Sequence, residues 1–402
     1  MLSILRTRNR AGQVMVCAAM AAALLCAVGC GDVYRPVANP QLLPGGDPQA
    51  IHFAFVLNNN NGNLGTVSQI DMSGDSNQSN HPAGLNPVYA TVQPATASVF
   101  VANQGDDTMT AFSTSSFLAP VTVTLPPGSK PNFVAIAGTG RAFVVTPGTN
   151  PPSVTEINTG INVVIASIPV GNGPVAAIAT PDGSKAYVLN RADNTVTVIN
   201  VGSGVVTKTI AVGVSPTWPV MSADGTTLWV VNQGSDSVSV IDTGSDSVTK
   251  SITVGVSPRY AAFEPRLLRL YVANAGSNSV SVIDFSTETV LATVPVGAAP
   301  VSLTPLQDGT KVYVANSGCQ DVVALQSCNG NTVSVVDANS MTMTKTITVG
   351  TTPISIGSAS DAIRVVVVNR DSNNISDIRT SDDTVVTTIP SGSPTPVWVT
   401  IL

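Results

Sequence analysis

Two short phrases recur along the chain at a nearly constant interval, and this constrains the fold more than any other feature. The first phrase is an aromatic residue followed by Val, any residue and Asn, as in "YVAN". Its copies, some of which carry substitutions, begin at residues 55, 100, 143, 187, 229, 271, 313 and 366. The second phrase, Gly-x-x-Pro, begins at residues 84, 128, 171, 213, 255, 297 and 350. Both phrases step by 42 to 45 residues, with one longer step of 53 before the last copy. Such a period predicts propeller blades or a solenoid.

One repeat, residues 213 to 254, shows how each unit is built. It contains four strand-like segments, "TWPVMS", "TLWVVN", "SVSVID" and "VTKSITV", and an Asp-Gly pair separates the first two. Asp-Gly favours a tight hairpin turn. Four antiparallel strands in about 42 residues are typical of a propeller blade.

The composition agrees with blades that cover one another. Charged residues make up 10% of the 402 residues and hydrophobic residues 43%. A sheet with one solvent-exposed face would place charged side chains on that face. Strands such as "SVSVID" carry no charged side chain on either face before the final Asp. We therefore expect an all-β propeller of four-stranded antiparallel blades.

The ordered set of phrases resembles the YVTN family of beta-propeller repeats, from about residue 50 to the C-terminus. The family pattern is interrupted at "FVVT", where Thr146 replaces Asn, and in the last unit, which lacks the aromatic residue and has Arg379 in place of Asp. The resemblance implies a ring of similar blades, with these two blades less regular.

Ring closure follows from the two ends of the repeat region. No innermost strand precedes "IHFAFVLN" near residue 51, while the chain ends in "PTPVWVTIL", an innermost strand without a successor. We expect the C-terminal strand to complete the N-terminal blade, giving eight blades by count, with seven as the alternative.

The N-terminus predicts export and lipid attachment. Residues 1–29 combine three Arg, an apolar run and small residues before Cys30, which resembles a bacterial lipoprotein signal. A plain secretory signal and an uncleaved anchor are the alternatives. Cys30 would carry lipid, residues 30–48 would form a flexible Pro/Gly-rich tether, and residues 49–402 would form the propeller.

The remaining cysteines and the charge narrow the function. Cys319 and Cys328 are an even pair in an oxidising compartment and predict a disulfide; a metal pair is the alternative. Removing residues 1–29 takes away three Arg and moves the formal charge from −6 to −9. An acidic domain without a basic cluster makes nucleic acid an unlikely partner.

The repeated Asn residues are candidate ligands, but turn capping is the stronger interpretation. Each ends a strand before a Gly/Ser/Asp turn, where its side chain can bond the local backbone. The series comprises Asn58, Asn103, Asn190, Asn232, Asn274, Asn316 and Asn369. The same role is expected for Asp242, Asp284 and Asp337.

The candidate binding residues follow the Gly-x-x-Pro phrase, where the innermost strand enters the channel. Aromatic residues and Arg on a concave rim favour recognition; packing between blades is the alternative. The expected channel-mouth residues are Tyr89, Phe133, Trp218, Arg259, Tyr260 and Trp398. The insertion between Cys319 and Cys328 opens on the same face and is either a recognition loop or a tolerated addition.

No motif for catalysis is present in the sequence. The two His residues, His52 and His81, stand apart from Cys, Asp or Glu clusters, and no nucleophile elbow, P-loop or zinc motif occurs. We expect no cofactor and no metal; the acidic turns lack the spacing of a calcium loop.

These observations favour a lipid-anchored, extracytoplasmic scaffold that binds a protein, peptide or glycan without catalysis, as a monomer at the cell membrane or outer membrane, facing the periplasm or the surface. The alternatives are a lactonase-like hydrolase with a metal or polar site in the channel and an envelope structural protein.

Overall fold

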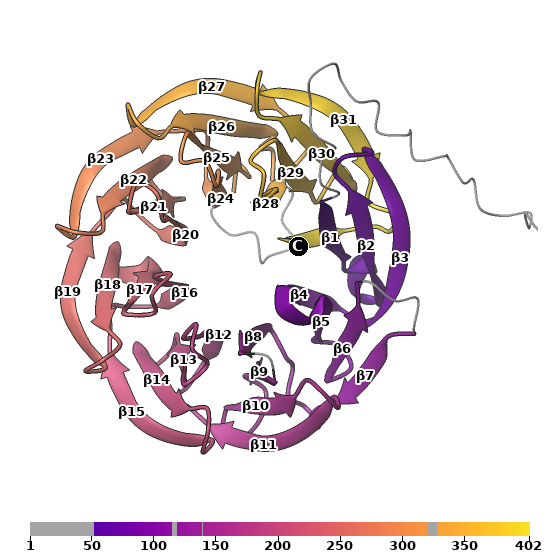
Figure 1. The fold of residues 1–402 in the computed structure, drawn as a ribbon, viewed down its shortest axis with the longest axis vertical. Helices are drawn as coiled ribbons and strands as arrows, with labels where there is room; N and C mark the ends of the chain where they lie inside the picture. Colours follow the sequence, from indigo (N-terminus) through magenta and orange to yellow (C-terminus); the bar gives the residue numbers. More distant parts are fainter. Residues whose placement is uncertain (1–51, 115–118, 139, 320–327) are drawn as a thin grey trace, which may run out of the picture. The chain divides into compact units, whose positions relative to one another are not determined.

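Each repeat folds into four strands, and the strands form a closed ring (Figure 1). The computed structural model describes residues 52–114, 119–138, 140–319 and 328–402. Eight four-stranded antiparallel sheets surround a central channel, with the first strand of each blade nearest the centre and the fourth at the outside. The prediction of eight blades is confirmed. The predicted signal, Cys30 and the tether lie outside the described residues.

The first four blades contain sixteen strands. Blade 1 consists of β32 (Pro396–Ile401), β1 (Phe53–Asn58), β2 (Leu64–Asp71) and β3 (Ser76–Leu85); blade 2 of β4 (Pro87–Gln93), β5 (Ser98–Asn103), β6 (Thr108–Ser113) and β7 (Val121–Thr124); blade 3 of β8 (Phe133–Ala137), β9 (Arg141–Thr146), β10 (Ser153–Asn158) and β11 (Val163–Pro169); and blade 4 of β12 (Pro174–Ala179), β13 (Lys185–Asn190), β14 (Thr195–Asn200) and β15 (Val205–Ala211).

The other four blades repeat the arrangement. Blade 5 consists of β16 (Pro216–Met221), β17 (Thr227–Asn232), β18 (Ser237–Asp242) and β19 (Ser247–Thr253); blade 6 of β20 (Pro258–Glu264), β21 (Arg269–Asn274), β22 (Ser279–Asp284) and β23 (Thr289–Pro295); blade 7 of β24 (Pro300–Pro305), β25 (Lys311–Asn316), β26 (Thr332–Asp337) and β27 (Thr342–Thr348); and blade 8 of β28 (Pro353–Ser358), β29 (Arg364–Asn369), β30 (Asn374–Arg379) and β31 (Thr384–Pro390). In the described residues, three single-turn 3-10 helices lie in connections: η1 (Asn60–Gly62), η2 (Pro94–Thr96) and η3 (Gln233–Ser235).

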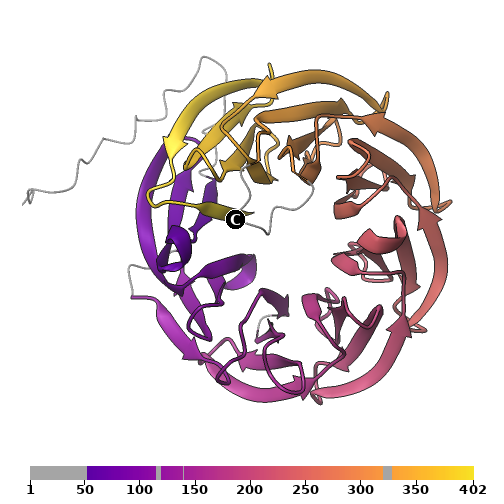
Figure 2. The same ribbon diagram turned by 180° about the vertical axis from the view of Figure 1, so that it is seen from behind.

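The C-terminal strand closes the ring as expected. β32 pairs antiparallel with β1, placing Val399 opposite Val56 and Trp398 opposite Leu57. Seen from behind, the yellow β32 lies beside the indigo β1 (Figure 2). Hydrogen bonds between the two ends of the described chain therefore hold the ring shut.

Apolar side chains fill every boundary between neighbouring blades. Seven core clusters cover the eight boundaries, and one of them spans blades 3 to 5. The aromatic residue of the "YVxN" phrase is fully buried in four successive blades, as Tyr187, Trp229, Tyr271 and Tyr313. Because full burial of one large apolar side chain contributes roughly 1.5–3 kcal/mol, the repeated phrase stabilises each boundary.

In two of the blades, a Lys and a Tyr of the second strand also bond an Asp of the next blade, and we call this polar contact the latch. In blade 4, the Lys185 Nζ lies 2.8 Å from the Asp246 Oδ2 of blade 5, and the Tyr187 hydroxyl donates to the Asp246 Oδ1 at 2.6 Å. Lys311 and Tyr313 of blade 7 hold Asp383 of blade 8 in the same way. Burial, followed by the hydrogen bond with Asp246, raises the pKa of Tyr187.

Blade 8 has a different latch at its boundary with blade 1. Val366 stands in place of the aromatic residue, and Asp377 lies opposite it on the neighbouring strand. The Arg364 Nη2 is 3.9 Å from the Asp75 Oδ1 of blade 1. Asp377 is fully buried, and burial together with its interaction with Asp75 raises its pKa. This pair takes the place of the tyrosine hydroxyl bond.

The two irregular repeats still form complete four-stranded blades. In blade 3 the Thr146 hydroxyl donates to the Ser153 carbonyl oxygen at 2.7 Å, so Thr146 bridges the second and third strands from the position that Asn holds elsewhere. The sequence departures therefore leave the strand order intact.

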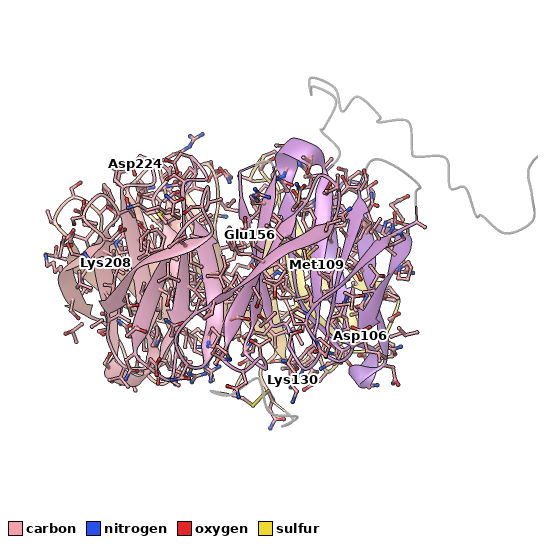
Figure 3. The ribbon with its side chains drawn as sticks, turned by 90° about the horizontal axis from the view of Figure 1, so that it is seen from below. Asp106, Met109, Lys130, Glu156, Lys208 and Asp224 are labelled. Atoms are coloured by element: carbon pink, nitrogen blue, oxygen red, sulfur yellow. A yellow bond between two sulfur atoms is a disulfide. The ribbon has the colours of Figure 1, made fainter. Side chains whose placement is uncertain are left out.

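The ring has two opposite faces. Loops from the fourth strand to the next innermost strand, including Lys130, lie on one face; the first hairpin of each blade, including Asp224, lies on the other (Figure 3). No helix in the described ranges is long and apolar enough to cross a membrane.

Candidate functional site

A cavity of about 800 Å³ opens at the centre of one face. We call it the mouth cavity. Every blade contributes the residue that follows the Pro at the entry to its innermost strand: Val88, Asn132, Val175, Thr217, Arg259, Val301, Ile354 and Val397. The cavity is therefore a direct product of the Gly-x-x-Pro phrase, which fixes where each innermost strand begins.

The next residue of each innermost strand forms the floor of the mouth cavity. This position is aromatic in five blades, and these five residues form what we call the aromatic layer: Tyr89, Phe133, Trp218, Tyr260 and Trp398. All six residues that the sequence placed at the mouth, these five and Arg259, line the cavity. Binding by them remains a proposal.

The aromatic rings pack on one another inside the channel. Tyr89 stacks on Phe133 with ring centroids 3.9 Å apart, and it contacts Trp398 at 4.9 Å. The Trp218 ring closes the set of contacts: its centroid lies 5.7 Å from those of both Phe133 and Trp398. It also lies 4.6 Å from the Tyr260 centroid. The same rings also pack against the apolar clusters between the blades, as the alternative of packing predicts.

The two tyrosines of the aromatic layer are poor acids. Burial is the main cause that raises the pKa of Tyr260 to about 12, and burial also raises the pKa of Tyr89, with a further contribution from Tyr260. Both rings keep some accessible surface, but that surface faces the channel cavities. The phenols therefore stay neutral hydrogen-bonding groups at neutral pH.

A polar rim surrounds the mouth cavity above the aromatic layer. Five of its residues directly follow the Asn or Asn-like end of a second strand: Asn59, Gln104, Arg191, Gln233 and Arg370. The sequence reasoning missed these residues. Their position in the repeat could have identified them, because each directly follows the repeated Asn, in the turn that opens on the mouth face.

Hydrogen bonds join the rim side chains across blade boundaries. The Arg191 Nη2 of blade 4 donates to the Gln233 Oε1 of blade 5 at 2.8 Å. Gln233 in turn donates from Nε2 to the Ser257 hydroxyl at 3.1 Å. Between blades 1 and 2, Asn86 Nδ2 donates to Gln104 Oε1 at 3.2 Å. The rim is thus a network that holds its side chains in place.

The charge of the mouth cavity is opposite to that of the whole chain. Its described lining contains three basic residues, Arg191, Arg259 and Arg370, and one acidic residue, Asp371, although the chain carries a formal charge of −6. Because an Arg has five N–H donors in a fork, this lining is suited to an anionic group.

Asp371 is held in its ionised form. Its carboxylate lies 2.8 Å from the Arg370 Nε and accepts a hydrogen bond from the Thr352 hydroxyl at 2.6 Å. Burial alone would raise the pKa of Asp371, but the bonds from Arg370 and Thr352 outweigh it and hold the pKa below its ordinary value. This carboxylate is therefore an anchor for Arg370 and a weak general base.

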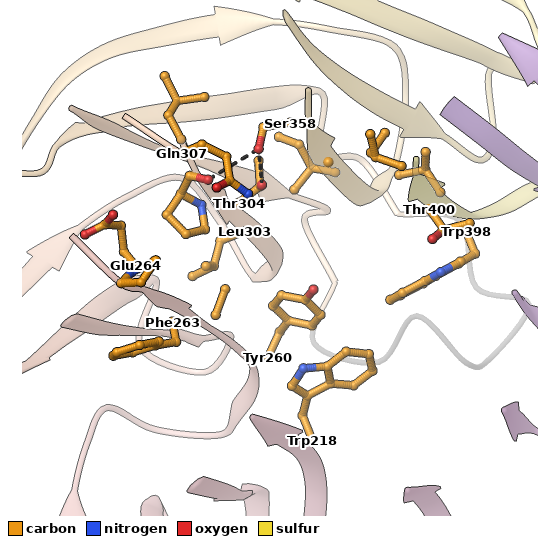
Figure 4. A pocket seen from close by; sticks show the side chains of 18 of the residues that line it. Trp218, Tyr260, Phe263, Glu264, Leu303, Thr304, Gln307, Ser358, Trp398 and Thr400 are labelled. Carbon is orange, nitrogen blue, oxygen red and sulfur yellow. Dashed lines mark hydrogen bonds between the residues drawn. The ribbon is translucent and has the colours of Figure 1, made fainter. Parts of the chain in front are cut away.

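A second cavity, of about 370 Å³, lies on the other side of the aromatic layer. We call it the hairpin-face cavity because the first hairpins of blades 6 and 7 form its edge (Figure 4). Tyr89, Trp218, Tyr260 and Trp398 line both cavities. The aromatic layer thus divides the channel into two compartments.

The repeated Asn residues act at the turns, mainly through side-chain partners; Asn58 also donates to the Val56 backbone carbonyl, as expected, at 3.4 Å. Asn232 Nδ2 donates to the hydroxyls of Ser237 at 3.2 Å and Ser239 at 3.0 Å on the following strand. Side-chain oxygens of the following strand accept from all seven residues: Asn58, Asn103, Asn190, Asn232, Asn274, Asn316 and Asn369. All seven are buried, and none lines the mouth cavity.

The acidic turn residues and the cysteines also have defined positions. Asp242 Oδ1 accepts from the Ser245 backbone N–H and hydroxyl, both at 2.7 Å, and these bonds lower its pKa; Asp284 and Asp337 do the same. Cys319 and Cys328 form a disulfide. The Thr352 backbone N–H donates to the Gly330 carbonyl oxygen at 2.7 Å, which ties the segment after Cys328 to the Arg370 side of the mouth.

The two His residues lie away from the mouth cavity. His81 stacks on Phe112, and burial lowers its pKa; His52 pairs with Asp361 at 2.8 Å. Across residues 52–114, 119–138, 140–319 and 328–402, no group of three or more His, Cys, Asp or Glu side chains is placed to hold a metal ion.

The fold and the channel together define the class: an eight-bladed propeller with a basic, aromatic-floored cavity at one mouth. The family model described as "Lactonase, 7-bladed beta-propeller" matches residues 51–253 and 220–401. The chain therefore belongs to this lactonase propeller family, and it has one blade more than the family description states. The more specific YVTN assignment remains a resemblance.

Solved structures share the fold at low sequence identity. Hydrazine synthase from Kuenenia stuttgartiensis is 20% identical with a TM-score of 0.58, over 73% of this chain and 96% of that one. The dihydro-heme d1 dehydrogenase NirN, in complex with DHE, is 12% identical with a TM-score of 0.72, over 89% and 76%. A functionally unknown protein from Desulfotomaculum acetoxidans is 18% identical with a TM-score of 0.55, over 87% and 98%. No curated protein matches the chain.

Proposed function

We propose that this protein is a non-catalytic binding module whose mouth cavity receives an anionic ligand with a flat or apolar body. The observation that carries the proposal is the pairing of three Arg side chains at the rim with an aromatic floor. A carboxylate or sulfate group would bond the guanidinium forks, and the body of the ligand would lie on the aromatic layer.

Two further features support ligand binding without catalysis. The rim side chains are held by bonds across blades, so the site is organised before the ligand arrives and loses little side-chain entropy. Asp371, the carboxylate of the mouth lining, is engaged by Arg370 and Thr352.

The proposal includes the location of the domain. The lipoprotein-like signal before Cys30 supports a lipid-anchored propeller held outside the cytoplasm by a tether, and the proposal takes it to act as a monomer. Labelling of expressing cells with a fatty-acid analogue should mark the wild type and leave Cys30→Ser unmarked; labelling of both would remove the anchor from the proposal.

The ligand proposal is tested with a matched pair of probes, benzoate and benzamide, on the purified propeller. Saturation-transfer NMR and titration calorimetry should show that benzoate binds more tightly than its neutral analogue. Arg191→Gln with Arg370→Gln should remove the preference, since each lost charge-assisted bond costs about 1.5–3 kcal/mol. Equal binding of the two probes, or a preference that survives the double substitution, would contradict the proposal.

Membership of the lactonase propeller family favours one alternative, a lactone hydrolase that uses the same cavity. Proton release from glucono-δ-lactone, with and without added divalent cations, measures that activity directly. Turnover above the buffer rate that is lost in Arg191→Gln/Arg370→Gln would replace the binding proposal with the enzyme.

A further inference from the structure

The hairpin-face cavity has the features of a second binding site, chemically unlike the mouth. Its walls come from the ends of four innermost strands, β20, β24, β28 and β32, in blades 6, 7, 8 and 1. Pro265 and Gln307 at its edge are exposed to solvent. The cavity is thus reached from the face opposite the mouth.

The sequence of the innermost strands explains why this space is open. The position that carries an aromatic ring in five blades is Ser302 in blade 7 and Ser355 in blade 8. Both serines are buried, and neither lines the mouth cavity or the hairpin-face cavity. The aromatic layer is therefore incomplete on this side, and a hollow remains beneath Tyr260, Trp218 and Trp398.

Polar groups face the rings across the hollow. In Figure 4, Thr304, Ser358 and Gln307 lie on one side, with Tyr260 and Trp218 on the other and Thr400 beside Trp398. The Thr304 and Ser358 hydroxyl oxygens are 3.0 Å apart, and Ser358 donates to the Pro305 carbonyl oxygen at 3.3 Å. Thr304 therefore donates to Ser358 and keeps lone pairs for a ligand.

Two further polar groups are available to a ligand. Within the described part of the chain, the Gln307 amide and the Thr400 hydroxyl have no hydrogen-bond partner, and both side chains line the cavity. Together they offer two amide donors, an amide oxygen and a hydroxyl.

The charge of the hairpin-face cavity excludes the ligand class proposed for the mouth. No Lys or Arg occurs among the described residues that line it, and its acidic member is Glu264. Glu264 is 1% exposed, and its two oxygens accept from the Arg266 and Leu267 backbone N–H groups at 2.9 and 2.6 Å. Its role is to hold the turn, and its charge disfavours an anion.

We propose that the hairpin-face cavity binds a neutral polyhydroxylated ring, the size of a single sugar residue. One face of such a ring presents C–H groups, which pack on the electron-rich faces of aromatic side chains, and its hydroxyls both donate and accept. The aromatic layer supplies the first surface, and Thr304, Gln307 and Thr400 supply the polar groups. A volume of about 370 Å³ falls in the range of small-ligand pockets.

The test uses neutral D-glucose, D-galactose and myo-inositol as probes, with D-glucuronate as the charged control, on the complete propeller domain. Saturation-transfer NMR should detect at least one neutral probe, with glucuronate weaker. Gln307→Ala with Thr400→Val should weaken it by about tenfold, the effect of losing two hydrogen bonds, with an unchanged melting temperature. The conservative Gln307→Glu variant, which keeps an acceptor, should retain part of the affinity.

Arg191→Gln/Arg370→Gln at the mouth is the matched control and should leave the neutral probe unaffected. Conversely, the hairpin-face variants should leave benzoate binding unchanged, so failure here is separable from failure of the mouth proposal. No saturation transfer to any neutral probe, or a signal abolished by the mouth variant and untouched by Gln307→Ala/Thr400→Val, would overturn the inference.

Discussion

Gly213 lies directly against the side chain of Asn232. A Cβ atom at position 213 would come within 2.7 Å of the carboxamide carbon of Asn232. The same contact recurs between Gly84 and Asn103 and between Gly171 and Asn190. The two repeated phrases meet at the same place in blade 2 and in blades 4 to 8: the buried Asn holds the turn, and Gly lets the entry to the same blade pass over it. In blade 3, where Thr146 replaces Asn, an added Cβ at Gly128 would meet nothing within 4 Å.

Gly213→Ala should destabilise the propeller by about 1–3 kcal/mol, the usual cost of forcing an extra methyl group into a packed site. Denaturant unfolding measures the change. Gly244→Ala is the control in the same blade: Gly244 is exposed, and its added Cβ would meet only the Asp242 Oδ1, at 3.4 Å. Equal losses for the two variants would contradict the role given to the Gly–Asn contact.

Tyr187→Phe should lower the free energy of unfolding by about 1.5–3 kcal/mol, because the phenol donates to the Asp246 carboxylate across the boundary of blades 4 and 5. Asp246→Asn separates the two parts of the latch: it keeps an acceptor for Tyr187 and removes the charge that pairs with Lys185. A Tyr187→Phe variant as stable as the wild type would show that the hydroxyl bond contributes nothing.

Asp377→Asn should change how stability depends on pH. Burial, the hydrogen bond with Asp75 and the Asp75 charge raise the pKa of Asp377 to about 8, against the opposing effect of Arg364. The folded protein keeps this proton where the unfolded chain has lost it, so the wild type should lose stability as the pH rises from about 4 to about 8. One proton gives at most about 1.4 kcal/mol per pH unit.

Denaturant unfolding between pH 4 and pH 8 should give a flatter profile for Asp377→Asn, which keeps a neutral side chain at every pH. Asp382→Asn, measured from pH 4 down to pH 2, gives a control of opposite sign. Bonds from Arg379 and Thr384 lower the pKa of Asp382 to about 2, so its contribution is lost as the pH falls below 4. A profile for Asp377→Asn that is parallel to the wild type would refute the assignment.

Replacing Cys319 and Cys328 by Ser should leave the ring folded. The bridge joins residues nine positions apart at the turn that follows β25, with Cα atoms 5.3 Å apart, and neither Cys belongs to a strand. A closed loop of this length contributes about 2–4 kcal/mol. Circular dichroism should keep its β-sheet signal and show one cooperative transition at a lower temperature; a sheet signal that disappears would place the disulfide in the folding core.

The sequence also located the six channel residues, because position within a repeat decides position in the ring. Trp218 and Tyr260 stand at equivalent places in successive repeats, and equivalent places of a closed ring face the same axis. The rim residues Arg191 and Arg370 also occupy equivalent places in their repeats, directly after the Asn of the repeated phrase. Position within the repeat therefore predicts that they face the channel, and the prediction from the sequence did not include that position.

The repeats by themselves determined the four-stranded blades, their number and the closure by β32, since a period of about 42 residues records local strand and turn preferences in the chain. Only the tertiary structure decided which side chains from distant repeats meet. Tyr89 and Trp398, Asp377 and Asp75, and Thr304 and Ser358 are joined by ring closure or by packing between blades. Their partners depend on side-chain size and burial across a boundary, which no single repeat encodes.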